Sequence, residues 1–149
     1  MKFKAPVILM ILMATIMTAF VASPSSSAGE PWSASQLLSP ADLAKTLNNQ
    51  KIPHPVIYSI GPQAVIKESI DIGSTRDKAN LEKLKNNVAK LPKEANIVIY
   101  CGCCPFGNCP NIRPAFELLN KMGFKNHKLL NLTQNIKVDW IDKDYPVNY

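Results

Sequence analysis

All four cysteines of this chain lie within one short segment, "CGCCPFGNCPN" at residues 101–111. Cysteine sulfur acts as a nucleophile, as a soft metal ligand and as a redox group. A disulfide inside this segment would close only a few residues and stabilise the fold by about 2 kcal/mol, whereas structural disulfides normally join distant segments. The clustering therefore indicates chemistry at sulfur rather than structural cross-linking.

The segment is placed between two regular elements. It follows the apolar, β-rich run "NIVIY" (96–100) and precedes the helix-like run "NIRPAFELLNKMG" (111–123). A loop that leaves a buried strand and enters a helix offers converging backbone N–H groups and the positive end of the helix dipole, which lower the pKa of a thiol. Cys101, directly after the strand, is the predicted nucleophile, and Arg113 is expected to add positive charge at the rim of the loop.

Metal binding is one alternative use of the cysteines. The spacing C-x-C-C-x4-C supplies four soft ligands suited to Cu(I) or Zn, namely Cys101, Cys103, Cys104 and Cys109. Structural zinc sites usually combine two separated pairs of ligands, and His54 and His127 stand in no recognisable ligand spacing. The leading interpretation therefore includes no metal.

Dithiol chemistry is the other alternative. Cys101 and Cys104 form a C-x-x-C pair, which can cycle between dithiol and disulfide. No C-x-x-C-H motif is present, so the sequence does not support covalent haem attachment.

Strand-like and helix-like runs alternate along the chain. Strands are expected at 55–60, 96–100 and 128–132, helices at 77–91 and 111–122, and one or two helical turns at 136–141. This alternation predicts an α/β fold with a mainly parallel central sheet flanked by helices on both faces. In such folds the site lies beyond the carboxyl ends of the strands, where Cys101 is expected.

Helix boundaries are marked by capping residues. Ser39 followed by Pro40 and Asp42 predicts an additional helix start, with Ser39 as N-cap. Asn111 is the best N-cap for the helix after the cysteines, and Gly123 marks its end.

The first 28 residues read as an export signal. Lys2 and Lys4 precede an apolar run that is shorter than a membrane-spanning helix, and small residues follow up to a plausible cleavage point after Ala28. The mature chain would then be residues 29–149, a single domain located in a periplasm or outside the cell and not attached to a membrane.

Charge gives no indication of a nucleic-acid partner. The 149-residue chain has a formal net charge of +6, which falls to +4 once Lys2 and Lys4 are removed. The remaining lysines alternate with acidic residues, as in "DKANLEKLKNNVAKLPKE", a pattern typical of a solvated helix face.

The second half of the chain resembles the rhodanese-like domain family. As in that family, an apolar strand ends in a cysteine, here Cys101. The end of the active loop and the start of its helix are similar to Asn111, Arg113 and Ala115. The "G(F/Y)" that follows the helix is similar to Gly123 and Phe124. The terminal "VDWIDKDYPV" is similar to the family's "W…YPV" segment through Trp140, Tyr145, Pro146 and Val147.

This resemblance implies a sulfurtransferase without a cofactor. The Cys101 thiolate would take a sulfane sulfur from a donor such as thiosulfate, hold it as a persulfide and pass it to a thiol, a protein thiol or cyanide. Cys103, Cys104 and Cys109 are the candidate resolving thiols. The expected binding loop consists of Gly102, Cys103, Cys104, Gly107, Asn108, Cys109, Asn111 and Arg113.

Overall fold

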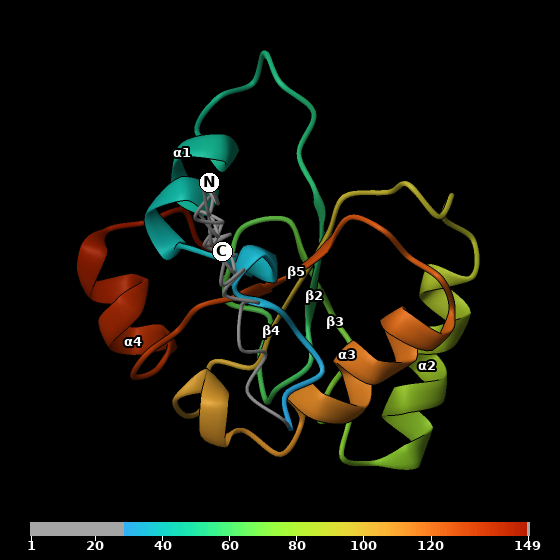
Figure 1. Ribbon diagram of the computed structural model, residues 1–149. Coiled ribbons are helices and arrows are strands. Elements are labelled where there is room, and N and C mark those ends of the chain that lie inside the picture. Colours follow the sequence, from blue (N-terminus) through green and yellow to red (C-terminus); the bar gives the residue numbers. More distant parts are fainter. Residues whose placement is uncertain (1–28, 149) are drawn as a thin grey trace, which may run out of the picture.

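The computed structural model describes residues 29–148, so the expected export signal at 1–28 lies outside the described residues. Figure 1 shows a central sheet with helices packed against it. The strands are β1 (Leu37–Leu38), β2 (Val56–Ser59), β3 (Ser69–Asp71), β4 (Ile97–Tyr100) and β5 (His127–Leu130). The α-helices are α1 (Pro40–Leu47), α2 (Lys78–Val88), α3 (Ile112–Lys121) and α4 (Ile136–Asp139), and short 3₁₀ turns occur at Ala34–Gln36, Phe106–Asn108 and Ile141–Lys143.

All five named strands are parallel, in the order β1-β5-β4-β2-β3. The prediction that "NIVIY" forms a central parallel strand is confirmed, because β4 pairs with β2 on one side and with β5 on the other. Each of the four residues of β4 is buried. Such a strand carries an unbroken apolar run because helices cover both faces of the sheet.

The two faces of the sheet form separate cores. Figure 1 shows α2 and α3 on one side of the sheet and α1 and α4 on the other. Ile97 and Ile99 of β4 belong to the core beneath α2 and α3, whereas Val98 and Tyr100 belong to the core beneath α1. The alternation follows from the two-residue period of a strand, and it confirms the expected α/β arrangement with helices on both faces.

The capping predictions for α1 and for the end of α3 are confirmed. The Ser39 hydroxyl accepts a hydrogen bond from the Asp42 N–H (3.1 Å), with Pro40 at the first helical position. Gly123 follows the end of α3 with φ +77°, a left-handed conformation that glycine adopts without steric cost. Helix α2 ends at Val88, three residues before the expected end at Leu91.

Two strands were not expected from the sequence, β1 and β3. Strand β1 is only two residues long, and β3 is the edge strand "SID", in which Ile70 is 40 % exposed. Neither segment has the length or the β-branched composition by which a strand is recognised in a sequence. Both are strands because they pair with a neighbouring strand of the sheet.

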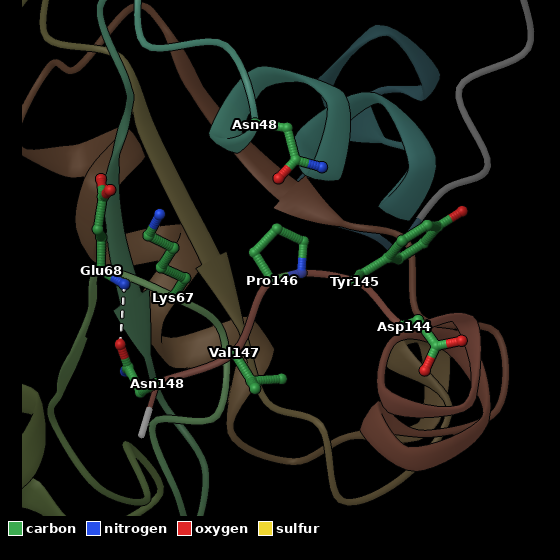
Figure 2. A pocket seen from close by; sticks show the side chains of 8 residues that line it. All are labelled: Asn48, Lys67, Glu68, Asp144, Tyr145, Pro146, Val147 and Asn148. Carbon is green, nitrogen blue, oxygen red and sulfur yellow. Dashed lines mark hydrogen bonds between the residues drawn. The ribbon is translucent and has the colours of Figure 1, made fainter.

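The last residues of the chain return to the amino end of β3. Trp140, fully buried, donates its indole N–H to the Pro146 carbonyl, and Val147 forms an antiparallel bridge with Ile66. Figure 2 shows the Asn148 amide oxygen accepting the Glu68 N–H (2.9 Å) beside a cleft of about 560 Å³. This cleft is remote from the cysteines, which follow the opposite, carboxyl end of the strands.

Among residues 29–148, no helix combines the length and the apolar composition needed to cross a bilayer.

Two neighbouring leucines of α3 give a test of the core beneath this helix. Leu119 is fully buried, whereas Leu118 is only partly buried. We expect Leu119→Ala to reduce the free energy of unfolding by about 2–5 kcal/mol, because it removes buried methyl groups and leaves a cavity. Leu118→Ala, the matched control, should cost clearly less in the same urea titration. Equal losses in the two variants would contradict the packing described for α3.

Candidate active site

Cys101 continues the alternation of β4. It lies two residues beyond Ile99 and belongs to the same core, beneath α3, with Cys109 and Ile112. Its side chain is 3 % exposed. The period of the strand thus directs the Cys101 sulfur toward the amino end of α3, as the sequence predicted for the nucleophile position.

Two glycines shape the backbone around Cys101. A Cβ atom at Gly61, which follows β2, would overlap the Cys101 carbonyl oxygen and would lie 3.0 Å from its Sγ atom. Gly102 has φ +83°, so the chain turns sharply as it leaves β4. The Gly102 carbonyl then accepts the N–H of Ile136, which fixes the turn against α4.

The turn brings Cys103 back onto Cys101. The Sγ atoms of these two residues are 3.2 Å apart, and the Cys104 Sγ lies 3.3 Å from that of Cys103. The Cys101 sulfur thus contacts that of Cys103, beside the left-handed Gly102, and the C-x-x-C pairing of Cys101 with Cys104 stays a prediction. Cys109, fully buried, completes a group in which the sulfurs of Cys101, Cys103 and Cys109 all lie within 4.8 Å of one another.

Asn111 connects the Cys101 sulfur to the loop between β3 and α2. Its Nδ2 group donates to Cys101 Sγ (3.2 Å), while its Oδ1 atom accepts from the Ser74 hydroxyl (2.6 Å) and the Arg76 N–H (3.2 Å). The Thr75 hydroxyl donates to the Asn111 carbonyl (2.6 Å). Since the amide oxygen is engaged twice, the NH₂ group is held toward the sulfur.

This network corrects the capping role predicted for Asn111. The residue does precede α3, but its side chain caps no N–H group of that helix. The sequence reasoning could not have found this, because the partners Ser74 and Arg76 are more than thirty positions away along the chain.

Hydrogen bonds and burial give the cysteines different pKa values. The Cys109 thiol above all, together with the Asn111 amide and the Cys103 N–H, lowers the pKa of Cys101 to about 5, although burial opposes the shift. Burial and the neighbouring sulfurs of Cys101 and Cys104 raise the pKa of Cys103 to about 12. The bond to Cys101 and burial also raise the pKa of Cys109. These shifts make Cys101 the first of the three thiols to ionise.

The rest of the expected binding loop does not form a ring of N–H donors around the sulfur. Gly107 and Asn108 lie in the short 3₁₀ turn at Phe106–Asn108, where the N–H of Asn108 bonds to Pro105 and that of Cys109 to Phe106. The donors directed at Cys101 are instead the Asn111 amide, the thiols of Cys109 and Cys103, and the single N–H of Cys103.

Arg113 differs from its expected role as a charge at the rim. Its guanidinium donates to the Glu30 carboxylate (2.6 Å) and to the Gly107 carbonyl (3.0 Å), and it lies 5.7 Å from the centre of the Trp32 ring. Its charge is therefore paired, and it attaches the start of the described chain to the cysteine loop.

Four residues of the site were missed by the sequence reasoning: Gly61, Ser74, Thr75 and Arg76. Gly61 comes two positions after the end of β2, at the same end of the sheet as Cys101, and this placement was the only signal available for it. Ser74, Thr75 and Arg76 precede a helix start, which gave no indication that they contact Asn111.

Comparison with known proteins adds no identification, since no family model and no curated protein match the chain. The likeness to rhodanese-like domains therefore depends on the residues quoted above and on the compatible α/β sheet.

Gly61 gives a test of the backbone around the sulfur. We expect Gly61→Ala to lower the midpoint of urea unfolding and to perturb Cys101, because the new methyl group and the Cys101 carbonyl oxygen cannot occupy one position. Gly107→Ala is the matched control, since nothing lies within 4 Å of a Cβ atom at that position. A Gly61→Ala protein with unchanged stability and thiol titration would refute the close approach.

The Asn111 amide gives a test of the thiolate. In a pH titration followed by ultraviolet thiolate absorbance, the first ionisation should occur near pH 5 and should be absent from Cys101→Ser. Asn111→Ala removes a donor that favours the charged form, so this step should move to higher pH. Asn108→Ala, in the same loop, should leave it in place. An unshifted step in Asn111→Ala would show that the amide does not stabilise the thiolate.

Proposed function

We propose that this protein is a rhodanese-like sulfurtransferase whose nucleophile is Cys101. The observation that carries the proposal is the placement of a single thiol at the carboxyl end of the central parallel strand, where the Asn111 amide donates to its sulfur and Cys103 borders it. A fixed sulfur with donors that favour its anionic form is what nucleophilic sulfur chemistry requires.

The first half-reaction forms a persulfide. The Cys101 thiolate attacks the outer sulfur of a donor such as thiosulfate, a new S–S bond forms, and the S–S bond of the donor breaks to release sulfite with its electron pair. The negative charge then resides on the outer sulfur of the persulfide. The Asn111 NH₂ group is held by Ser74 and Arg76, so it needs no reorganisation to donate to this anion.

Because the pKa values of Cys103 and Cys109 are raised, these two thiols compete little with Cys101 for the donor. An external thiol or cyanide accepts the outer sulfur and restores the Cys101 thiolate. The protein acts on a small sulfur donor after export to a periplasm or to the outside of the cell, and its acceptors include protein thiols.

Cys103 provides an internal route of discharge. Its sulfur is exposed and lies 3.2 Å from that of Cys101. When the Cys103 sulfur attacks the inner sulfur of the persulfide, a Cys101–Cys103 disulfide forms and the S–S bond of the persulfide breaks. The outer sulfur leaves with its electron pair and takes up the Cys103 proton, as hydrogen sulfide. An external dithiol then reduces this disulfide and regenerates both thiols.

A dithiol/disulfide redox function of the same pair is the second candidate. The contact between the Cys101 and Cys103 sulfurs favours this function. An external disulfide is enough to oxidise the two thiols to a disulfide, and no sulfur donor is needed. The two functions differ in what is released from a sulfur donor, because only sulfur transfer releases sulfite from thiosulfate.

Intact-mass measurement after treatment of the reduced protein with thiosulfate tests the proposal. We expect the gain of one sulfur atom, reversed by a reductant, and no gain in Cys101→Ser. Cys103→Ser should accumulate the persulfide, because its nearest discharge partner is gone, while Cys104→Ser should behave like the unaltered protein.

Two results would redirect the interpretation. Loss of hydrogen mass without release of sulfite from thiosulfate would favour the redox function over sulfur transfer, because internal discharge through Cys103 also ends in a disulfide but releases sulfite first. Persulfide formation that persists in Cys101→Ser and disappears in Cys104→Ser or Cys109→Ser would place the nucleophile elsewhere in the loop.

A further inference from the structure

The cysteine loop gathers three sulfur atoms from three different parts of the backbone. Cys101 directly follows β4, Cys103 lies in the turn after Gly102, and Cys109 lies three residues before α3. All three Sγ atoms lie within 4.8 Å of one another. A metal–sulfur bond of about 2.3 Å, as in zinc thiolates, separates the sulfurs of a trigonal site by about 4 Å, so the observed spread fits such a site with small adjustments.

We propose that Cys101, Cys103 and Cys109 form a three-coordinate Cu(I) site. Thiolates are soft ligands that select Cu(I), and this ion is satisfied by three sulfurs in one plane. Structural zinc, in contrast, takes four ligands in a tetrahedron. In the described part of the chain, the cluster of ligands at this position contains no histidine or carboxylate, and Cys104 stands outside the three-sulfur group.

The surroundings of the three sulfurs suit a closed site with one entrance. Cys101 and Cys109 are buried in the core beneath α3, whereas Cys103 is exposed. An ion can therefore reach the cluster past Cys103 and is then shielded from water by the core. Asn111 donates to Cys101 Sγ from the side, in the manner of groups outside the coordination sphere that orient a ligand.

Binding changes no oxidation state. Cu(I) replaces the thiol protons, which pass to the solvent, and the copper–sulfur bonds form without electron transfer. This site goes beyond the proposed sulfur transfer but uses the same Cys101 sulfur. Copper loading and persulfide formation should consequently exclude each other.

Cu(I) titration of the reduced protein under anaerobic conditions, in competition with a chromogenic Cu(I) chelator, tests the site. We expect one Cu(I) per chain and an X-ray absorption spectrum with three sulfur neighbours. Cys103→Ser should weaken binding by about 100-fold or more, at least as much as the loss of a group outside the coordination sphere costs other metal sites. Cys103 is exposed, so this variant should fold normally; Cys109→Ser tests the buried ligand.

Cys104→Ser is the matched control, because it removes a cysteine of the same loop. It should retain the copper affinity, because Cys104 lies outside the three-sulfur group. An equal loss of affinity in Cys104→Ser and Cys103→Ser would overturn the assigned ligands, and failure of the unaltered protein to hold Cu(I) would overturn the site. Persulfide formation is measured separately on metal-free protein. A protein that forms a persulfide without binding copper therefore refutes only this inference, and the reverse result refutes only the sulfurtransferase.

Discussion

The cysteine loop depends above all on one side-chain amide, that of Asn111. Its two ends contact different parts of the fold, the sulfur of Cys101 on one side and the loop between β3 and α2 on the other. A buried amide left without partners would be costly, so each contact supports the other. The hydrogen bond from Asn111 to the Cys101 sulfur therefore depends on the packing of three elements, because it forms only when β3, β4 and the start of α3 are all in place.

The cysteines are chemically different because the fold places them differently. Cys101 directly follows strand β4, and several hydrogen-bond donors point at its sulfur. Cys109 is buried in the core, whereas Cys103 is exposed to solvent. A single thiolate within a set of protonated thiols can attack a donor without competition. The same three sulfurs also meet the spacing requirement of a soft metal ion.

The elements that carry the site were predictable from the sequence, whereas the contacts within it were only partly so. Periodicity and flanking residues sufficed for β4, α2 and α3, and they placed Cys101 at the end of the central strand. The contact between the Cys101 and Cys103 sulfurs accompanies a left-handed backbone at Gly102, which local sequence does not prescribe. The roles of Ser74 and Glu30 were equally hidden, because each meets its partner only after segments distant in sequence have packed together.

The packing of residues 146–148 against the segment before β3 has a consequence for the edge of the sheet. The Tyr100 hydroxyl accepts the Ile66 N–H, and the segment around Ile66 is also held by Pro146, Val147 and Asn148. Edge strands with open hydrogen-bonding groups can pair with other chains. Residues 146–148 occupy hydrogen-bonding groups next to this edge strand and so limit its pairing with another chain.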